Sequence, residues 1–255
     1  MSNIKNIVIT GATSGIGFAL AKSYAKENIN LFLCGRNNHK LQEIKNICQK
    51  LQANVETKIL DVSDENEAKN WILEISKNHT IDLVIANAGI SAGTEGGTES
   101  FEQVQKIFKT NIDGVLNIIH PVIEIMKEQK SGQIALMSSL AGFRGLPSSP
   151  AYSASKSCVR VYGEALRGNL DKFNIKVNVI CPGYIKTPMT AVNNFPMPFL
   201  LEVEDAVKII KNGLAKNKSR IAFPFPLYFV VWFATLLSNK ITDPIFRKLP
   251  GKKSL

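Results

Sequence analysis

A tyrosine and a lysine four residues apart, Tyr152 and Lys156, are well suited to proton transfer. At this spacing both side chains project from one face of a helix. A phenol is a poor base at its ordinary pKa of about 10, and bringing that pKa near 7 requires about 4 kcal/mol. One cation about 4 Å away supplies roughly that energy at an effective dielectric constant of 20. The pair therefore predicts a tyrosine that acts as an acid or a base near neutral pH.

A second segment, Thr10 to Gly17, is rich in glycine and lies between an apolar run and a helical pattern. Such a loop lets the backbone turn sharply and approach a pyrophosphate, and the following helix N-terminus supplies free N–H groups and partial positive charge. The spacing is TGxxxGxG, which differs from the GxGxxG fingerprint. The loop residues expected to contact a dinucleotide are Gly11, Thr13, Ser14, Gly15, Ile16 and Gly17.

Two further segments lie upstream of the tyrosine. A predicted strand ends in Ser138-Ser139-Leu140-Ala141-Gly142, with Ser139 thirteen residues before Tyr152, and Asn111 interrupts a helical stretch before it. With the glycine loop, these motifs resemble the short-chain dehydrogenase/reductase family over about residues 4–223. The resemblance implies an oxidoreductase that moves a hydride between nicotinamide and an alcohol or carbonyl.

The resemblance also implies roles for the individual side chains. Tyr152 would be the general acid or base, and Ser139 would hydrogen-bond the substrate oxygen beside it. Lys156 would lower the tyrosine pKa together with the positive nicotinamide ring, and would bind the nicotinamide ribose. Asn111 would hold a water that links the lysine to solvent, while Ser138 would serve the backbone.

Cofactor contacts are implied at the ends of later predicted strands. Asp61-Val62 would contact the adenine, and Asn87-Ala88-Gly89 would lie against the ribose. In the segment Pro182-Gly183-Tyr184-Ile185-Lys186-Thr187, the Thr187 side chain and the Ile185 backbone would hold the carboxamide. The cofactor set thus includes Pro182, Gly183, Ile185 and Thr187, together with Tyr152 and Lys156.

The end of the second predicted strand bears on the choice of cofactor. NAD-dependent enzymes place an acid there, whereas this chain has Cys34-Gly35-Arg36-Asn37. A charge-assisted hydrogen bond from Arg36 to a 2′-phosphate is worth about 1.5–3 kcal/mol. NADP(H) is therefore favoured. NAD(H) stays open as the alternative, because Ser14 stands where NADP-dependent relatives often carry a second basic residue.

The elements that must position these residues alternate between apolar strands and amphipathic helices. We expect a Rossmann-type α/β fold, with a doubly wound, mostly parallel seven-stranded sheet and helices on both faces. The predicted strands are Asn6–Thr10, Asn30–Cys34, Glu56–Leu60, Leu83–Asn87, Gly132–Ser138, Lys176–Cys181 and Arg220–Phe223. The predicted helices are Gly17–Glu27, His39–Leu51, Glu65–Lys77, Phe101–Asn111 continuing through Met126, Tyr152–Asp171 and Val203–Lys216. No linker divides residues 1–255, which predicts a single domain.

A hydrophobic extension, residues 224–255, follows the core pattern. Residues 221–237 are almost wholly apolar, but Pro224 and Pro226 interrupt a run already too short to span a membrane. We expect a short hydrophobic helix from about Leu227, followed by a basic tail. Two interpretations stay open: the helix caps the core or a partner subunit, or it docks on a membrane surface beside an apolar substrate entrance.

Composition narrows the remaining function classes. The formal charge of +10 is scattered without a recognition motif, which disfavours nucleic-acid binding. Four cysteines without CxxC spacing and three histidines disfavour a metal site or a disulfide framework. Without a targeting pattern at Met1–Lys5, we expect a cytoplasmic protein, which could lie at the membrane surface.

Substrate choice is expected to come from segments outside the motifs. These are the glycine-rich loop Ile90–Ser100, the segment Phe143–Pro150, and a lid at Met189–Leu201 that contains Phe195, Met197, Phe199 and Leu200. The apolar lid predicts a hydrophobic alcohol or ketone. A catalytically idle scaffold that senses NADPH and a peripheral membrane module are the competing hypotheses. By analogy with the family, helices Phe101–Met126 and Tyr152–Asp171 are expected to pack in a homo-oligomer.

Overall fold

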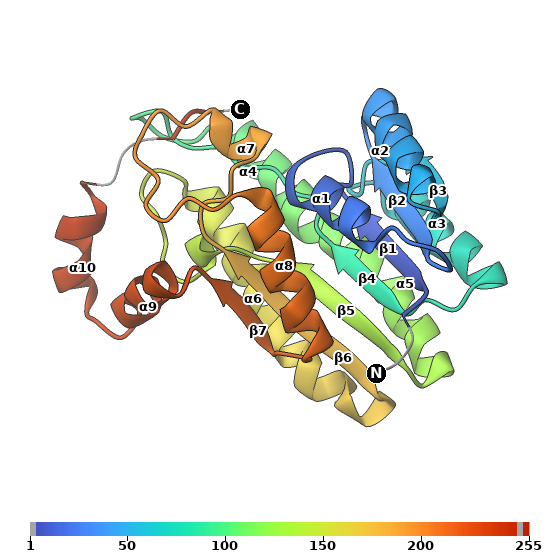
Figure 1. Cartoon of the computed structure of the whole chain (residues 1–255). Helices are drawn as coiled ribbons and strands as arrows, with labels where there is room; N and C mark the ends of the chain where they lie inside the picture. Colours follow the sequence, from blue (N-terminus) through green and yellow to red (C-terminus); the bar gives the residue numbers. More distant parts are fainter. Residues whose placement is uncertain (1–3, 249–251, 255) are drawn as a thin grey trace.

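The computed structural model describes residues 4–248 and 252–254, and a parallel sheet runs through its centre (Figure 1). Within the described residues the sheet has seven strands in the order β3-β2-β1-β4-β5-β6-β7, and every neighbouring pair is parallel. The strands are β1 (Asn6–Thr10), β2 (Asn30–Gly35), β3 (Asn54–Ile59), β4 (Leu83–Ala86), β5 (Gly132–Met137), β6 (Ile175–Pro182) and β7 (Arg220–Phe223). This architecture confirms the predicted fold class. The strand order reverses between β1 and β4, where parallel sheets of this kind bind ligands at their carboxyl ends.

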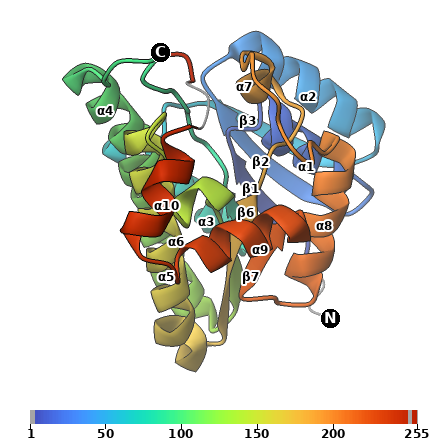
Figure 2. The same ribbon diagram turned by 90° about the vertical axis from the view of Figure 1, so that its left-hand side faces the viewer.

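Helices cover both faces of the sheet (Figure 2). The bounds are α1 (Gly15–Tyr24), α2 (Asn38–Lys50), α3 (Glu65–Asn78), α4 (Phe101–Phe108), α5 (Gly114–Gln129), α6 (Pro150–Leu170) and α8 (Val203–Ala215). Side chains alternate across each strand, so Ile7 and Ile9 join α1, α2 and α8 in one core. Val8 joins α3, α5 and α6 in the core on the opposite face.

The predicted long helix over Phe101–Met126 is present but not uniform. Between α4 and α5 the backbone forms a π-helical turn, Lys109–Asp113. Such a turn inserts an extra residue into a helix and is frequent at functional sites. Asn111 lies in this turn and is fully buried. The sequence pattern marks the interruption but does not distinguish a π turn from a break.

The C-terminal elements lie at the β7 edge of the sheet (Figures 1 and 2). Helix α9 (Phe225–Ala234) begins two residues before the predicted Leu227, because a proline in the first helical turn has no N–H to leave unpaired. A second helix, α10 (Asn239–Phe246), was not among the predicted elements. Leu227, Tyr228 and Val231 pack α9 onto a small core centred on Leu140. No helix in the described part of the chain is long and apolar enough to cross a membrane.

Candidate active site

A cavity of about 660 Å³ opens at the carboxyl ends of the strands and brings most of the predicted residues together. At one end it is lined by the glycine loop and the ends of β2, β3 and β4, and at the other by β5, α6 and the C-terminal helices. Gly17 and Asn111 are the two predicted residues behind the lining. The predicted residues in the lining are Gly11, Thr13, Ser14, Gly15, Ile16, Arg36, Asp61, Val62, Asn87, Ala88, Gly89, Ser139, Tyr152, Lys156, Pro182, Gly183, Ile185 and Thr187.

The glycine loop is tied to the end of β4. Gly11 has φ +65°, and a Cβ on it would lie 2.8 Å from the Ala88 Cα, so only glycine fits. The Thr10 hydroxyl accepts hydrogen bonds from the backbone N–H groups of Asn87 and Ala88, each at 3.0 Å. Sequence reasoning did not assign a role to Thr10, although the residue precedes the first glycine of the motif.

The first turn of α1 faces the cavity without a side-chain cap, because Ser14 at its N-cap position makes no capping hydrogen bond. Free N–H groups at a helix N-terminus favour a phosphate. Together with the close backbone approach at Gly11, this arrangement fits the pyrophosphate of a dinucleotide.

Arg36 and Asp61, which the sequence assigns to separate cofactor contacts, are in fact partners. The Arg36 Nη1 lies 3.5 Å from the Asp61 Oδ2, and both side chains are about half exposed. Burial raises the Asp61 pKa, but hydrogen bonds from Ser63 and the Arg36 charge outweigh burial and hold that pKa below its usual value. An exposed pair of this kind contributes at most about 1 kcal/mol, so Arg36 stays available to an anion. The end of β2 itself has no acid, but the Asp61 carboxylate lies near Arg36 because β2 and β3 pair side by side.

Asn111 positions the loop after β4. Its Oδ1 accepts from the Ile90 N–H at 2.8 Å, and its Nδ2 donates to the Ile90 carbonyl at 2.9 Å. The same Nδ2 donates to the Ser155 hydroxyl at 3.0 Å. A Cβ on Gly89 would lie 3.2 Å from the Asn111 Oδ1 and 3.3 Å from the Lys156 Nζ. The asparagine and the lysine therefore both lie against Gly89.

Lys156 is buried, and its Nζ donates to the Met137 carbonyl at 2.9 Å. Burial lowers the pKa of its ammonium to about 8. The Nζ lies 5.8 Å from the centre of the Tyr152 ring. The lysine and the tyrosine therefore lie close together on α6.

Tyr152 hydrogen-bonds two hydroxyls, those of Ser139 and Ser91. Burial raises the Tyr152 pKa above its ordinary value, and the two serines only partly offset that rise. The tyrosine is thus held as a protonated phenol, ready to donate. Ser91 is a contact that sequence reasoning missed, because nothing in the loop Ile90–Ser100 marks this hydroxyl.

The two serines after β5 have different roles. The Ser138 Oγ donates to the Lys156 carbonyl at 2.7 Å, which confirms that it serves the backbone. The Ser139 Oγ accepts from the Ala141 N–H at 3.1 Å and lies in the cavity beside Tyr152. Ser139 is therefore the serine placed to contact a ligand.

The predicted lid contributes fewer apolar contacts than expected. Ile185 and Leu201 pair as an isolated parallel bridge, and the short helix α7 (Pro188–Ala191) follows Thr187. Met189 and Phe195 line the cavity. Met197, Phe199 and Leu200 do not line it, because the chain turns at Phe199 (φ +56°) to bring Leu201 back to Ile185.

The substrate end of the cavity is completed by the C-terminal helices. Its lining includes Leu227, Val230, Phe233, Ile245 and Phe246 from α9 and α10. The Arg144 Nη2 pairs with the Asp243 Oδ1 at 2.5 Å and anchors α10 to the loop after β5. Lys252, from the tail, also lines the cavity. The sequence marked this extension as hydrophobic but could not place it.

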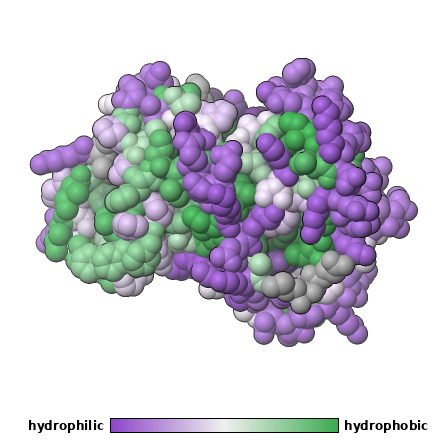
Figure 3. All heavy atoms as spheres, viewed as in Figure 1, coloured by the Kyte–Doolittle hydropathy of each residue, from purple (hydrophilic) through white to green (hydrophobic). Residues whose placement is uncertain are grey.

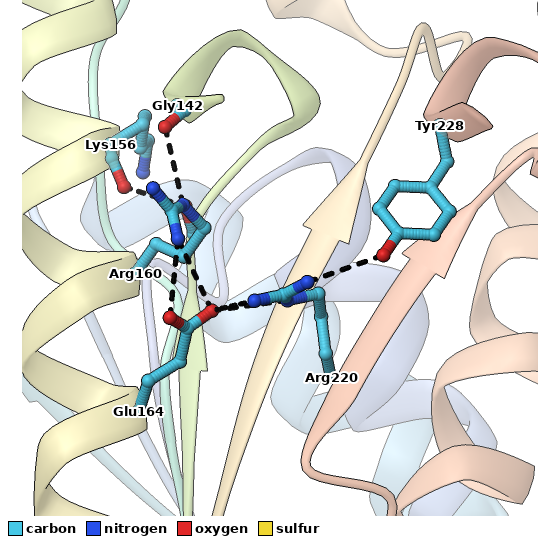
Figure 4. Close-up of polar contacts among 7 residues, drawn as sticks. Gly142, Lys156, Arg160, Glu164, Arg220 and Tyr228 are labelled. Carbon is cyan, nitrogen blue, oxygen red and sulfur yellow. Dashed lines mark hydrogen bonds and ion pairs between the residues drawn. The ribbon is translucent and has the colours of Figure 1, made fainter. Parts of the chain in front are cut away.

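A network of polar and charged side chains joins α6 to β7 and α9 (Figure 4). Glu164 on α6 accepts from Arg160 at 3.1 Å and from the Arg220 Nη2 at 2.5 Å. The Arg220 Nη1 donates in turn to the Tyr228 hydroxyl at 3.2 Å, and Arg160 donates to the Gly142 carbonyl at 3.3 Å. The network therefore couples the position of α9 to the helix that carries Tyr152 and Lys156.

The four cysteines are free, and three of them, Cys34, Cys48 and Cys181, are buried. Burial raises the pKa of the Cys34 and Cys181 thiols to about 12, so neither is a nucleophile near neutral pH. In residues 4–248 and 252–254, no group of three or more His, Cys, Asp or Glu side chains could hold a metal ion.

Comparisons with known proteins agree with this geometry. The family profile described as short chain dehydrogenase matches residues 5–196. An uncharacterized oxidoreductase of Myxococcus xanthus is 36% identical over 246 residues, covering 96% of this chain and 97% of that protein. The 3-oxoacyl-[acyl-carrier-protein] reductase of Chlamydia trachomatis is 31% identical over 73% of this chain and 76% of its own. Among solved structures, a short-chain dehydrogenase from Sphingobium yanoikuyae in complex with NADPH shares the fold, with a TM-score of 0.80, 20% identity and 96% of each chain covered.

Proposed function

The chain belongs to the short-chain dehydrogenase/reductase family of NAD(P)-dependent oxidoreductases, and we propose that it interconverts a hydrophobic secondary alcohol and its ketone with a preference for NADP(H). One observation carries the proposal. A single cavity joins the glycine loop to the Ser139–Tyr152–Lys156 group and continues into an apolar region formed by α9 and α10. A reacting carbon held beside Tyr152 has the dinucleotide region on one side and room for an apolar chain on the other.

The dinucleotide end is assigned to the residues that fit it. The N-terminus of α1 and the glycine loop would hold the pyrophosphate, and Asp61 and Val62 would hold the adenine. Asn87 to Gly89 would lie along a ribose, and Thr187 with the Ile185 backbone would hold the carboxamide. When bound there, NADP(H) supplies or accepts the hydride.

The protein's own part in the reaction is proton transfer and charge stabilisation. In the reductive direction Tyr152 donates its phenolic proton to the carbonyl oxygen, and in the oxidative direction it takes that proton back. The Ser139 hydroxyl donates to the same oxygen and stabilises the charge that develops on it. The Lys156 ammonium keeps the region positive, which favours the tyrosinate that donation leaves behind.

Preference for NADP(H) rests on Arg36. Its guanidinium is more than half exposed at the end of β2, where a 2′-phosphate would lie, and its pairing with Asp61 is weak enough to be shared or replaced. The Asp61 carboxylate, which hydrogen bonds from the Ser63 N–H and hydroxyl help to keep ionised, reduces this preference.

An activity screen tests the proposed function. We expect NADPH-dependent reduction of ketones to become faster as their chains lengthen from about 4 to 10 carbons, and we expect NADH to be used less well. Short hydrophilic keto-sugars reduced faster than long-chain ketones would contradict the apolar substrate. No turnover with any carbonyl compound, combined with tight NADPH binding, would favour the alternative of an idle scaffold that senses NADPH.

A second proposal concerns the outer surface of α9 and α10, which is strongly apolar (Figure 3). Phe225, Phe229 and Leu236 are exposed there and do not line the cavity. The neighbouring Lys240, Arg247 and Lys248 are exposed, whereas the one acid of this segment, Asp243, pairs with Arg144. An apolar face bordered by unbalanced positive charge suits an anionic bilayer surface. We therefore propose docking on anionic membranes beside the substrate entrance.

Sedimentation with phosphatidylglycerol vesicles tests this docking. We expect the protein to sediment with these vesicles and not with phosphatidylcholine vesicles. The double variant Phe225→Ser/Leu236→Ser should stay in the supernatant, whereas Phe101→Ser, an equally exposed residue on α4, should behave as the wild type. A wild-type protein that remains in the supernatant would contradict docking.

Light scattering tests a separate proposal, made by analogy with the family, that the protein is a homo-oligomer packed through α4, α5 and α6.

A further inference from the structure

The C-terminal tail is built into the active site. The Gly93 N–H donates to the Lys253 carbonyl at 2.6 Å, and the Glu95 N–H donates to the Lys252 carbonyl at 2.8 Å. A Cβ on Gly93 would lie 2.4 Å from both the Cβ and the carbonyl oxygen of Lys252. Glycine at position 93 is therefore required for the tail to lie against this loop.

The paired tail directs one side chain at the reacting group. The Lys252 Nζ donates to the Ser91 hydroxyl and lies 5.3 Å from the centre of the Tyr152 ring. Because Ser91 also hydrogen-bonds the Tyr152 hydroxyl, a single hydroxyl group separates this ammonium from the phenol. A ligand oxygen bound by Lys252 would thus lie only a few atoms from an oxygen bound by Tyr152.

Lys252 differs from the other cations of the cavity. In the described part of the chain, four cationic side chains line it, and each of the other three has a charged or carbonyl partner: Arg36 has Asp61, Arg144 has Asp243, and Lys156 has the Met137 carbonyl. No ion pair of Lys252 is found among the described residues. The loop Ile90–Ser100 carries two carboxylates: that of Glu95 accepts from the Ser254 hydroxyl, and that of Glu99 accepts from the Ala151 N–H.

A largely buried ammonium without a counter-ion carries a desolvation cost that an anionic ligand would offset. Burial indeed lowers the pKa of Lys252 to about 8, so the side chain is still mostly protonated at pH 7. The remainder of this end of the cavity is apolar, with Leu227, Val230 and Phe233 among its lining residues. The site thus combines one cation without a counter-ion among the described residues, close to Tyr152, with an apolar trough.

We propose that Lys252 is a specificity-determining residue that binds a substrate carboxylate close to the reacting carbon, so that the substrates are apolar-chain hydroxy acids and oxo acids. This inference rests on the proposed function, since it names the substrate class of the same site. A 3-hydroxy acid has the required geometry, because one CH₂ group separates the carbinol carbon from the carboxylate. Its hydroxyl would lie between Ser139 and Tyr152, its carboxylate against Lys252, and its chain along α9.

Four alcohols built on a ten-carbon chain test the proposal in the oxidative direction. With 3-hydroxydecanoate the reaction would be 3-hydroxydecanoate + NADP⁺ → 3-oxodecanoate + NADPH + H⁺. The hydrogen on the carbinol carbon would leave as hydride to NADP⁺, and the hydroxyl proton would pass to Tyr152. The matched probes are methyl 3-hydroxydecanoate and 2-decanol, which carry no charge, and 9-hydroxydecanoate, whose carboxylate lies at the far end. We expect 3-hydroxydecanoate to have the highest kcat/KM, by roughly 10- to 100-fold, the range of one charge-assisted hydrogen bond.

Two variants and two matched controls separate the lysine from the tail that carries it. Lys252→Met should lower the preference for 3-hydroxydecanoate over 2-decanol by roughly 10- to 100-fold, mainly through KM. Gly93→Ala should lower the same ratio, because its Cβ displaces the tail. Lys253→Met removes an equal charge from an exposed position, and Gly97→Ala adds a Cβ whose nearest neighbour is 3.6 Å away. Both of these controls should keep the wild-type ratio.

Calorimetric titration with decanoate gives a readout that needs no turnover. We expect decanoate to bind the wild type and the Lys253→Met variant, and to bind Lys252→Met roughly 10-fold or more weakly. Equal decanoate affinity in Lys252→Met, or an unchanged substrate ratio there and in Gly93→Ala, would overturn the assignment while leaving the proposed function intact. If instead no alcohol is oxidised but decanoate binding still depends on Lys252, the oxidoreductase proposal fails and the carboxylate site stands.

Discussion

The dinucleotide half of the cavity and its substrate half are assembled from the chain in different ways. In the first half each group follows a strand within a few residues: Gly11 follows β1, Arg36 follows β2, Asp61 follows β3 and Asn87 follows β4. In the second half the contacts join remote segments: Arg144 and Asp243 are 99 positions apart, and Ser91 and Lys252 are 161 positions apart. The sheet alone positions the residues of the first half, whereas the second half forms only when the C-terminal extension packs against the sheet.

This difference separates cofactor binding from substrate binding. The loops of the dinucleotide half follow the ends of adjacent parallel strands, and the register of these strands fixes where each loop begins. The substrate half is held by a few long-range polar links and by the packing of α9 on Leu140, Val179 and Cys181. Changes in the extension should therefore affect substrate use and leave dinucleotide affinity nearly unchanged.

The largest expected effect comes from the residue where the two halves meet. Tyr152→Phe removes the phenolic proton and should lower kcat/KM by about 10²- to 10⁴-fold, while NADPH binding measured by fluorescence stays close to wild type. The matched control is Tyr162→Phe on the same helix, where the lost hydroxyl lies 3.1 Å from the His120 Nε2. Equal turnover by Tyr152→Phe and the wild type would remove the tyrosine from the mechanism.

Arg36→Leu probes the dinucleotide half alone. Loss of one charge-assisted hydrogen bond should weaken NADPH binding by roughly 10- to 100-fold and leave NADH binding nearly unchanged. Fluorescence titration with both cofactors measures the difference, and Lys50→Leu, at the exposed end of α2, controls for net charge. Equal losses for NADPH and NADH would place Arg36 away from the 2′-phosphate.

Glu164→Gln probes the link between α6 and the extension. It leaves the partly buried Arg160 and Arg220 without a carboxylate, so we expect the free energy of unfolding to fall by about 1–3 kcal/mol. The melting temperature should fall by about 2–4 °C per kcal/mol in a chain of this size, and KM should rise while NADPH affinity holds. Glu74→Gln, an exposed position on α3, is the control. A fall in NADPH affinity equal to the rise in KM would show that the two halves are not separable.

The smallest effect expected concerns the pH dependence of stability. The Lys252 pKa is about 8 in the folded protein and about 10.4 in an unfolded chain, so between these pH values the unfolded chain binds more protons. The free energy of unfolding contributed by this lysine therefore rises with pH across that range, because its buried charge is lost. Relative to Lys253→Met, Lys252→Met should be more stable at pH 7, and the difference should shrink by pH 10. A difference in melting temperature that is constant with pH would contradict burial of the charged form.

Much of the fold and of the dinucleotide half could be predicted from the sequence, because the signals are local. A strand, a glycine turn and a helix occupy residues 6–24 without a break, and the four-residue spacing of Tyr152 and Lys156 fixes their common helix face. The corrections in this half are small. They are the π turn at Asn111 and the pairing of Arg36 with Asp61, which arise from helix packing and from the adjacency of β2 and β3.

The substrate half was decided only by the tertiary structure. Composition showed that residues 221–237 are apolar and that the tail is basic, but apolar residues pack without direction, and a lysine in a tail has no preferred partner in sequence. The position of Lys252 beside Ser91 depends on the return of α9 and α10 to the β7 edge, and on a glycine at position 93 that lets the tail approach. Local sequence signals predicted the glycine loop and the pairing of Tyr152 with Lys156, whereas long-range packing decided which side chains lie next to them.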